Sequence, residues 1–330
     1  MMRKNKITTI GGATRDIMFY TDDMLLIDNK KDLLRQKLIA FEWGAKVYSD
    51  DVYFTWGGGG ANTAVSLANL GIKTKTILSL GDDLVAQEIL QHLKKKNIDT
   101  TAIQKHSKKQ TGTSFIANVG KLNEHVIFAY RGANNDIDLS PNILRKINTP
   151  WIYISSLPAN FGKKMSILFT GCHDKDQNIA WNPGSNQLKM GLPNLRKFMS
   201  KTCVFIVNRD EALELLVSDK KIKTKNNINF ILKNLHKAGQ QVTVVTDGRK
   251  GAYVFDGKKI YSHKAIGGTG INTTGAGDSF GSAFVAGLIK YDWNIDKSLN
   301  LAILNSSHVI KKIGAQEGLL KSSDLKRYKL

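Results

Sequence analysis

Short apolar segments alternate with amphipathic helical stretches along most of this chain. Residues 73–81 form one such segment before an expected helix near 84–96, and residues 151–157 precede another helix near 160–172. The apolar run 203–208 leads into a helical pattern, and the run 242–248 follows an expected helix near 226–238. This alternation predicts βα units around a mainly parallel sheet, followed by two helices near 276–290 and 297–312.

Two regions depart from this rhythm. Residues 17–55 and 112–130 contain polar and apolar positions in alternation, which is typical of antiparallel strands with one exposed face. They adjoin the βα segments without a Pro/Gly-rich linker, and no internal repeat divides the chain. We therefore expect a single domain over residues 1–330, in which these two regions form a small β lid.

Composition excludes several classes of protein. No run of 18 apolar residues occurs, so a membrane-spanning helix is not expected. The basic residues 1–6 precede a strand-like segment rather than the apolar core of a signal peptide. Cys172 and Cys203 have neither a disulfide-framework spacing nor a metal-ligand spacing, which fits a reducing, cytoplasmic setting.

The formal net charge of +20 permits two interpretations. A basic surface can bind nucleic acid, but these lysines are spread along the chain instead of forming one stripe with aromatic residues. We interpret the charge as a solvated Lys-rich surface and expect no nucleic-acid and no membrane partner. A positive field would still favour an anionic nucleotide.

The common phosphate-binding motifs are absent from the sequence. The three Gly-Lys pairs, at 120–121, 162–163 and 257–258, are not followed by Ser or Thr, which excludes a P-loop. GxGxxG, HExxH and CxxC do not occur either. Any phosphate site must therefore be built in another way.

The strongest candidate is NTTGAGDSFGSAF, residues 272–284, in which a Gly-Ala-Gly turn opens a helix. Such a turn directs unsatisfied backbone N–H groups toward an anion, and small side chains allow phosphate to approach closely. Asp278 follows the turn at once and would lie beside a transferring phosphoryl group. The alternative is an aspartate that only caps a helix.

Two further glycine-rich segments carry polar residues. Four glycines at 57–60 open an amphipathic helix with Asn62 near its start, and a Gly-Gly pair at 11–12 follows the first strand and precedes Asp16. Ligands of open α/β folds bind at the carboxyl ends of the strands, where both side chains could meet a substrate. The alternatives are a flexible packing turn for the first segment and an ordinary turn residue for Asp16.

Taken together, these segments resemble the ribokinase-like (PfkB) carbohydrate kinase family almost from end to end. GGGGANTAVSLANLG (57–71) is similar to the N-terminal signature of the family, and NTTGAGDSFGSAFVAGL (272–288) to its C-terminal signature. Between them, and just after, the family's shorter motifs follow in family order: SLGDD (79–83), TGTSF (111–115), RGAN (131–134), NRDE (208–211), TDGRKGAYV (246–254) and IGAQEG (313–318). The resemblance implies a three-layer α/β/α body with a β lid, and phosphoryl transfer from ATP to an alcohol.

The resemblance also implies roles for individual residues. Asp278 would be the catalytic base, and the backbone of Gly275, Ala276 and Gly277 would form the anion hole. The expected substrate-binding residues are Asp16, Gly58, Asn62 and, at the lid edge, Arg131. The expected ATP-binding residues are Asn208, Glu211, Thr246, Gly248, Gly251 and Asn305, with Glu211 arranging Mg²⁺ through water. Asn272, Thr274 and Gly314 would lie at a monovalent cation site.

Three departures from the family pattern bear on substrate and cation. Asn272 stands where the family usually has Asp, so we predict weak or absent K⁺ activation. Gly59 stands where ribokinases have Lys, and the segment 154–160 lacks the Glu that ribokinases offer to the sugar. Ribose is therefore not assumed to be the substrate. Arg131 could meet a substrate phosphate, although an ordinary surface role is the alternative.

A sugar kinase is the leading hypothesis, and two others remain. A nucleoside kinase would use lid aromatic residues for base stacking, although these could equally form the lid core or a lid-to-lid homodimer interface. The candidates are Phe19, Tyr20, Phe41, Trp43, Tyr53 and Trp56. A non-catalytic sugar-binding regulator would have only the high charge in its favour.

Overall fold

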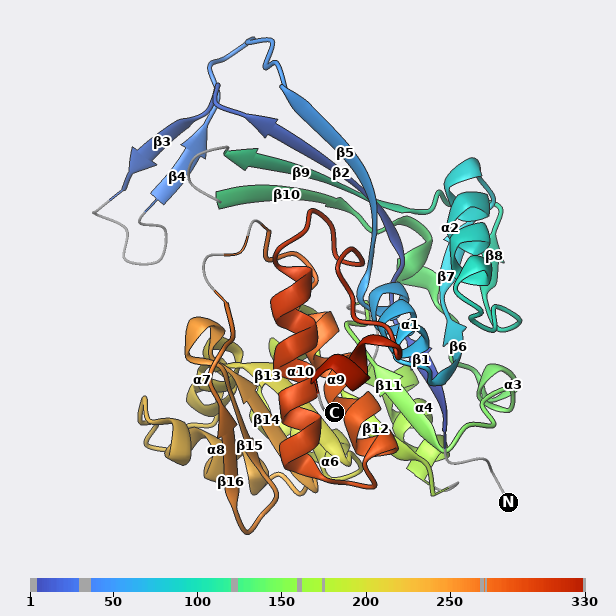
Figure 1. The fold of residues 1–330 in the computed structure, drawn as a ribbon, viewed down its shortest axis with the longest axis vertical. Helices are drawn as coiled ribbons and strands as arrows, with labels where there is room; N and C mark the ends of the chain where they lie inside the picture. The colour runs from blue at the N-terminus through green and yellow to red at the C-terminus, as the bar shows by residue number, and fades with distance from the viewer. Residues whose placement is uncertain are drawn as a thin grey trace.

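An eight-stranded sheet forms the centre of the molecule (Figure 1). The computed structural model describes residues 5–29, 37–119, 124–158, 162–173, 176–267, 270 and 272–328. The strand order in the sheet is β16 (Ile260–His263), β15 (Ala252–Phe255), β14 (Val242–Thr246), β13 (Val204–Asn208), β12 (Asn178–Trp181), β11 (Trp151–Ile154), β1 (Lys6–Ile10) and β6 (Lys73–Ile77). The strands from β14 to β6 are parallel, and β15 and β16 extend the sheet as antiparallel strands.

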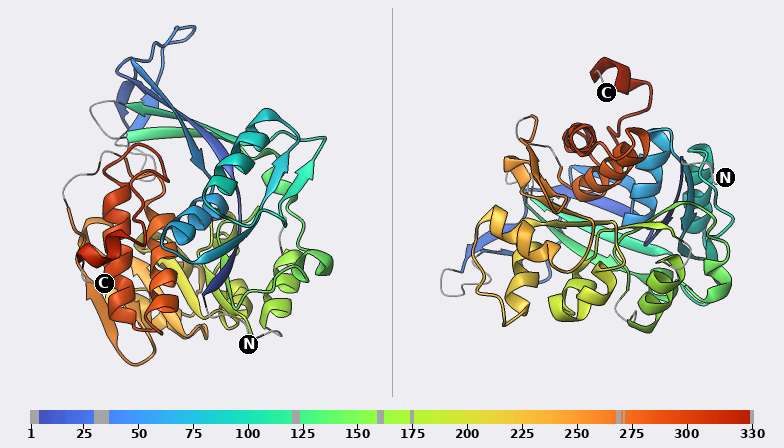
Figure 2. Two further views of the ribbon diagram at one scale, coloured as in Figure 1. Left: turned by 45° about the vertical axis from the view of Figure 1, so that its right-hand side comes forward. Right: turned by 90° about the horizontal axis from the view of Figure 1, so that it is seen from below.

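Helices cover both faces of this sheet (Figure 2). One face carries α1 (Gly59–Asn69), α9 (Ala276–Lys290) and α10 (Ile295–Val309), and α2 (Leu84–Lys95) packs beside α1. The other face carries α3 (Pro141–Leu144), α4 (Gly162–His173), α5 (Ser185–Leu188), α6 (Leu192–Met199), α7 (Arg209–Ser218) and α8 (Ile228–His236). The predicted three-layer α/β/α fold is therefore confirmed.

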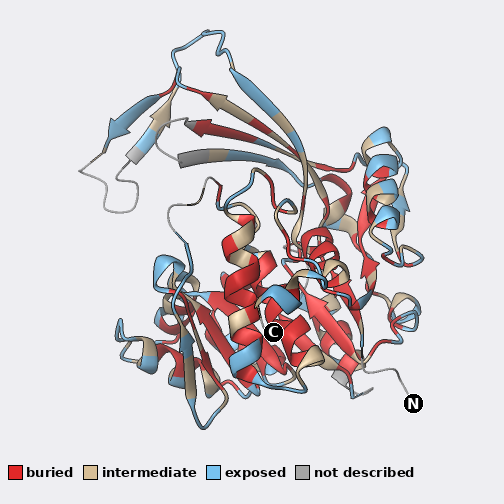
Figure 3. Ribbon diagram, in the orientation of Figure 1, coloured by how far each residue is buried: buried red, intermediate tan, exposed pale blue. Residues whose placement is uncertain are grey.

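The side chains of each central strand alternate between the two faces of the sheet, so both faces are covered by helices. In β11, Ile152 and Ile154 pack with the helices from α4 to α8, whereas Trp151 and Tyr153 pack with α9 and α10. Successive side chains of a strand point to opposite faces, so a strand that is apolar throughout requires cover on both sides. Figure 3 shows the result as a continuous buried band through the sheet and its nearest helices.

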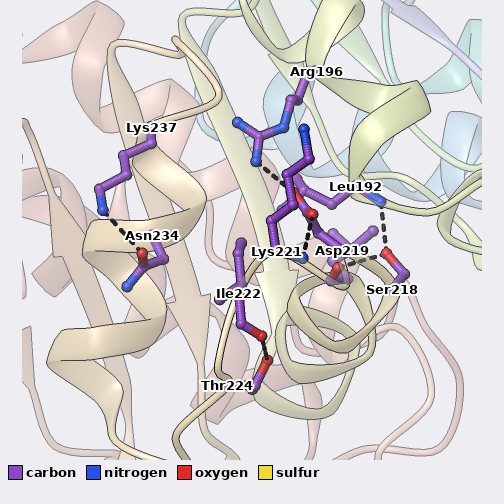
Figure 4. Close-up of polar contacts among 10 residues, drawn as sticks. Leu192, Arg196, Ser218, Asp219, Lys221, Ile222, Thr224, Asn234 and Lys237 are labelled. Atoms are coloured by element: carbon purple, nitrogen blue, oxygen red, sulfur yellow. Dashed lines mark hydrogen bonds and ion pairs between the residues drawn. The ribbon is translucent and has the colours of Figure 1, made fainter.

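The edge of the second helical layer shows how polar contacts join neighbouring helices (Figure 4). At the start of α6, the Leu192 N–H donates to Ser218 Oγ at 2.8 Å, and Ser218 in turn donates to the Leu215 carbonyl. Arg196 on α6 pairs with Asp219 after α7 at 2.7 Å. These contacts fix α6 against α7, on the layer opposite α9.

A second sheet projects from one end of the body as a lid. Its four strands lie in the order β10 (Glu124–Tyr130), β9 (Gly112–Val119), β2 (Thr14–Thr21) and β5 (Asp51–Gly57). A hairpin of β3 (Leu25–Asp28) and β4 (Lys37–Ala40) extends from it, and residues 30–36 and 120–123 of the expected lid segments lie outside the described residues.

One expectation about the lid was wrong. The sequence pattern predicted antiparallel strands, and β2–β5 and β9–β10 are antiparallel, but the central pair β2–β9 is parallel. Both central strands leave the body at the same edge, where Thr14 pairs with Gly112, and both run outward. Period-two alternation reports which faces of a strand are buried but not the direction of its neighbour.

The remaining elements are short. β7 (Ser79–Gly81) and β8 (Gln104–His106) form a parallel pair beside α2. Short 3₁₀ helices lie at η1 (Gly132–Asp136), η2 (Gly248–Lys250) and η3 (Asp324–Tyr328). Within the described part of the chain, no helix has the length and apolar character needed to span a membrane.

Candidate active site

The turn before α9 is held in one conformation by its neighbours. Gly275 has φ +77°, in the left-handed region, and a Cβ there would overlap Ala315, so the position requires glycine. The Ala276 N–H donates to the Thr273 carbonyl at 3.2 Å. Among the described residues, the N–H groups of Gly277 and Asp278 have no acceptor. A Cβ on Gly277 would meet only open space, so an anion can approach these two donors.

Two cavities meet at this turn. The smaller one has a volume of about 300 Å³ and lies between lid and body; it is lined by Asp16, Gly58, Asn62, Arg131, Thr274, Gly275 and Asp278, among others. The larger one has a volume of about 850 Å³ and is lined by Thr246, Gly248, Gly251, Ala276 and Gly277, among others. The turn therefore presents successive residues to different cavities, and the structure brings twelve of the predicted site residues to one or the other.

Asp278 faces the smaller cavity from the first turn of α9. Asn62 Nδ2 on α1 donates to Asp278 Oδ2 at 2.8 Å. Burial raises the pKa of the Asp278 carboxyl, the bond from Asn62 lowers it, and the nearby charge of Asp16 raises it further. A carboxyl group whose pKa is raised in this way accepts a proton more readily, which suits a general base.

Asp16 lies across the same cavity on lid strand β2. Its side chain is only 5% exposed, and Thr14 Oγ1 donates to Asp16 Oδ1 at 2.9 Å. Burial raises the pKa of Asp16, while the hydroxyl groups of Thr14 and Ser114 lower it. A Cβ on the neighbouring Gly57 would clash with this carboxylate, which explains why a glycine ends β5 at this point.

The N-terminus of α1 is closed to anions, in contrast to that of α9. The N–H groups of Gly60 and Ala61 both donate to the carbonyl of Gly12, at 2.9 and 3.1 Å. This contact joins the point where the chain leaves the body for β2 to the point where it returns from β5. The glycines at 57–60 thus bring strand and helix together, whereas the N–H groups of Gly277 and Asp278 at the α9 turn stay available to an anion.

The larger cavity has the properties of a nucleotide site. Its walls are apolar at Ile266, Phe280, Ile303 and Ile310, which suits a flat base, and Arg249 supplies a positive charge. The open space beside Gly277 lies where the phosphate end of a nucleotide would approach the turn. ATP therefore fits the residues present.

Asn208 and Glu211 lie at the N-terminus of α7 and form a reciprocal cap. Asn208 Oδ1 accepts from the Glu211 N–H at 2.9 Å, and Glu211 Oε2 accepts from the Asn208 N–H at 2.8 Å. Asn208 pairs with Thr246 across the sheet, so the cap lies one strand from the wall of the larger cavity. The described residues contain no cluster of three metal-ligating side chains. Neither Asn208 nor Glu211 lines the larger cavity, and Mg²⁺ binding through water at Glu211 stays a prediction.

Asn305 is not on either cavity, contrary to expectation. Its side chain is fully buried within α10, where its amide donates to Ser66 Oγ and to the Ser279 carbonyl and accepts from the Leu320 N–H. These partners satisfy the amide inside the protein. Ile303, Ser306 and Ser307 of α10 line the larger cavity instead, because side chains one or two places apart on a helix point in different directions.

The loop expected to hold a monovalent cation packs against the C-terminal segment. Asn272 is 8% exposed, its N–H donates to the Ile310 carbonyl at 3.2 Å, and its Oδ1 accepts from the Thr274 N–H at 2.7 Å. Gly314, with φ +100°, lies against Thr55 of β5. Gly275, which follows this loop, lies against Ala315, and cation binding at Asn272, Thr274 and Gly314 stays a prediction.

Sequence reasoning missed several residues of the site. Asn134, inside the quoted RGAN motif, bonds the backbone of Ala13 with both amide atoms and lines the smaller cavity. Arg249, inside TDGRKG, lines the larger cavity. Gln316, inside IGAQEG, donates from Nε2 to Asn62 Oδ1 at 3.0 Å. All three lie within the family motifs quoted above, so their place in those motifs could have identified them as candidate site residues.

A parallel α/β/α body, a β lid and two cavities that meet at a helix N-terminus define a small-molecule kinase of the ribokinase-like fold. Sequence comparison gives the same class, because the profile described as pfkB family carbohydrate kinase matches residues 27–322. The chain belongs to the PfkB family of carbohydrate kinases.

Relatives and solved structures agree with this assignment. The chain is 26% identical to an ATP-dependent 6-phosphofructokinase of Thermoanaerobacterium thermosaccharolyticum, over 90% of this chain and 94% of that protein. It is 29% identical to a ribokinase of Staphylococcus aureus, over 84% and 89% of the two chains. Its fold is similar to Arabidopsis thaliana ribokinase complexed with ribose and ATP, with a TM-score of 0.79, 18% identity and 98% of each chain covered. A nucleoside kinase of Methanocaldococcus jannaschii gives a TM-score of 0.75 at 20% identity, over 98% and 97%.

Proposed function

We propose that this protein transfers the γ-phosphoryl group of ATP to a sugar hydroxyl, with Asp278 as the general base. One observation carries the proposal: the α9 turn separates two cavities, with Asp278 on the smaller side and the backbone of Gly277 on the larger. An acceptor in the first cavity and a nucleotide in the second would meet at the free N–H groups of that turn. Phosphoryl transfer needs this kind of alignment more than covalent chemistry from the protein.

The residues of this chain divide the work. Asp278 takes the proton of the acceptor hydroxyl, and Asn62 holds the carboxylate by its 2.8 Å bond. The N–H groups at Gly277 and Asp278, with Gly275 and Ala276 shaping the turn, stabilise negative charge on the group in transfer. Bound ATP supplies that group, and Mg²⁺ arranged through water by Glu211 offsets its charge. The lid strands exclude water, which would otherwise compete as acceptor.

A sugar fits the acceptor cavity better than a nucleoside. None of the six aromatic residues considered for base stacking lines this cavity, and of these Trp43 and Phe41 are exposed to solvent. Tyr130 on β10 is the aromatic residue among the lining residues, and it lies beside Arg131 at the cavity edge. Asp16 offers two carboxylate oxygens for sugar hydroxyls, and Asn62, Gly58 and Arg131 complete the polar wall. A non-catalytic regulator has no use for an aspartate with a raised pKa beside an anion site.

Arg131 bears on the kind of sugar. It is exposed at the cavity edge and has no acidic partner among the ion pairs of the described residues. A guanidinium group in this position suits an acceptor that already carries a phosphate. The 6-phosphofructokinase relative is consistent with such an acceptor.

The remaining features of the proposal concern the whole protein. We take the chain as one kinase domain that works in the cytoplasm with ATP and Mg²⁺. K⁺ activation is expected to be weak because Asn272 has no formal charge. The lid exposes apolar side chains on several strands, including Leu25, Phe54 and Phe128, and a homodimer through the lid would cover them.

The decisive experiment is a phosphoryl-transfer assay across sugars, sugar phosphates and nucleosides with the wild type and Asp278→Asn. We expect transfer to one sugar class, and a loss of about a hundredfold or more in kcat for the variant, because a positioned base supplies that factor. ATP binding, followed by calorimetry, should persist in the variant. An Asp278→Asn enzyme within tenfold of wild type would reject the assignment of the base.

A further inference from the structure

A continuous line of hydrogen bonds runs from Asp278 to the surface of α2. Asn62 Nδ2 donates to Asp278 Oδ2 at 2.8 Å, Gln316 Nε2 donates to Asn62 Oδ1 at 3.0 Å, and His92 Nε2 bonds Gln316 Oε1 at 2.8 Å. The four residues come from α9, α1, the C-terminal segment and α2. Three elements far apart in the sequence therefore converge on the side chain of the proposed base.

Every bond in this line points the same way. Gln316 Oε1 can only accept, so His92 Nε2 carries the proton and donates. Gln316 and Asn62 then each accept with their oxygen and donate with their nitrogen. Hydrogen bonds aligned in series polarise one another, so the last N–H, which faces Asp278, is strengthened. The direction of the line also fixes the Asn62 amide with its nitrogen, rather than its oxygen, toward the carboxylate.

Packing holds both His92 and the segment that carries Gln316 in place. The His92 ring lies against Trp56, with ring centroids 5.6 Å apart, and Arg15 lies over Trp56 at 4.4 Å while pairing with Glu88. Ala315, next to Gln316, is the residue that a Cβ on Gly275 would overlap. The C-terminal segment thus supports the anion-binding turn with one residue and the base with the next.

We propose that Gln316 and His92 are positioning residues for the transfer reaction: they set the orientation of the Asn62 amide, and through it the orientation and charge of Asp278. The proposal rests on the proposed role of Asp278 and deepens it. Neither residue lines the acceptor or the nucleotide cavity, so neither is expected to contact a substrate. Their removal should therefore lower kcat and leave KM for ATP nearly unchanged, whereas KM for the acceptor responds only as far as the Asn62 amide turns.

The first test is Gln316→Glu, which keeps the size of the side chain but removes its donor. The Asn62 amide then lies between two carboxylates, one at residue 316 and one at Asp278, and its nitrogen can bond only one of them. When the nitrogen turns toward residue 316, the bond to Asp278 is lost. We expect kcat to fall by about tenfold, since hydrogen bonds to charged groups commonly contribute at least that factor. The acidic limb of kcat/KM should move to higher pH, because the bond from Asn62 lowers the pKa of Asp278. Asp16 is the other charged group that acts on Asp278, and it is unchanged in this variant.

A matched pair at His92 separates hydrogen bonding from packing. His92→Gln keeps a donor for Gln316 and should retain most of kcat, whereas His92→Phe keeps the ring beside Trp56 and should lose several-fold. A merely structural role for the ring predicts the reverse order. Melting temperatures of both variants, measured alongside, show whether either loss reflects unfolding.

An Asn62→Ala background shows whether Gln316 acts on Asp278 through Asn62 or directly. If Gln316 acts through Asn62, adding Gln316→Glu to Asn62→Ala should change kcat little, whereas a direct charge effect would lower it again. A Gln316→Glu enzyme with wild-type kcat and pH profile, or fully additive losses, would overturn the proposal. An Asp278→Asn enzyme that remains active would instead overturn the proposed general base. The hydrogen bonds from His92 through Gln316 and Asn62 would then have no catalytic residue to position.

Discussion

Asp278 is subject to opposing influences at the scale of a single residue. Burial in the cavity and the charge of Asp16 raise its pKa, and the hydrogen bond from Asn62 lowers it. The balance leaves a carboxylate that is costly to bury yet ready to accept a proton. Function and stability should therefore respond in opposite directions when the charge is removed.

Asp278→Asn should raise thermal stability at neutral pH while it removes activity. Because the folded pKa is raised above the ordinary 3.8, the folded state binds the proton more tightly than the unfolded state. The free energy of unfolding therefore falls as pH rises from the unfolded pKa of Asp278 to its folded pKa. Above the folded pKa, the buried charge destabilises the wild type most. We expect a rise in Tm of about 2 °C near pH 7.5, equivalent to about 1 kcal/mol in a large domain.

Calorimetry at several pH values checks this expectation, and the advantage of the variant should shrink as pH falls. Asp22→Asn is the matched control, because Asp22 lies on the lid with an exposed side chain. The expectation fails if Asp278→Asn has a lower Tm than wild type at neutral pH while Asp22→Asn keeps the wild-type Tm. The buried carboxylate of Asp278 would then stabilise the fold.

Asp16 should determine affinity for the acceptor and not for the nucleotide. It lies on the lid side of the smaller cavity, and the loss of a charge-assisted bond commonly costs about 1.5–3 kcal/mol. We expect Asp16→Ala to weaken acceptor binding by about tenfold or more and to leave ATP affinity within twofold. Arg249→Ala, on the wall of the larger cavity, should show the opposite pattern in the same titrations. If Asp16→Ala weakens ATP instead, the acceptor site has been misplaced.

Helices were predictable from the sequence where apolar residues recur at helical spacing and a turn or capping residue marks the first turn. The helix expected at 276–290 is α9 with the same bounds, since small residues in a Gly-Ala-Gly turn precede a run of apolar positions at helical spacing. The expected helix at 84–96 is α2, Leu84–Lys95, because Asp83 caps its start by accepting from the Ala86 N–H. Buried parallel strands such as β14 followed from continuous Val and Thr runs.

Other features depend on contacts that a sequence period does not encode. The parallel pairing of β2 with β9 is set by where both strands leave the body, and the burial of Asn305 is set by partners on α1, on α9 and in the C-terminal segment. The line through Gln316 joins residues more than 200 positions apart. Asn62, Asp278 and Gln316 stood within quoted motifs, but His92 and Asn305 did not, and only spatial placement gives each of them its partner.

The loop before α9 carries a prediction about cations at the scale of an element. Asn272 Oδ1 already accepts the Thr274 N–H, and Asn272 brings no formal charge to a site between this loop and the segment 312–318. Ligand charge tunes affinity in oxygen-ligand sites. We expect activity in K⁺, Na⁺ and Tris buffers of equal ionic strength to differ by less than about twofold, and Asn272→Asp to introduce a K⁺ preference.

Equal ionic strength matters in this comparison because a protein of net charge +20 responds to salt nonspecifically. Strong K⁺-specific activation of the unmodified enzyme at low concentration would contradict the expectation. It would mean that backbone carbonyls of the two segments suffice for the cation.

At the scale of the whole molecule, the lid differs from the body in what it exposes. Figure 3 shows the body strands buried and much of the lid exposed or half-buried. The lid exposes a large share of the chain's big apolar side chains, among them Leu25 at 65%, Phe54 at 64% and Phe128 at 54%. Apolar area of this kind on one element is the basis for the proposed lid-to-lid homodimer, because exposed apolar patches often mark protein–protein contacts.

We expect sedimentation velocity to show a dimer whose association depends on the lid. Phe54→Lys combined with Phe128→Lys should shift the protein to monomer, since both changes place a charge on the apolar surface of an already basic chain. Val217→Lys is the matched control, because Val217 is 66% exposed but lies on α7, in the helical layer opposite α9 and α10. Measurements at physiological and at raised ionic strength separate lid contact from charge repulsion between copies, which salt screens. A wild type that stays monomeric across the concentration series at both ionic strengths, or a control that dissociates as readily as the lid variant, would show that the exposed apolar side chains serve the lid alone.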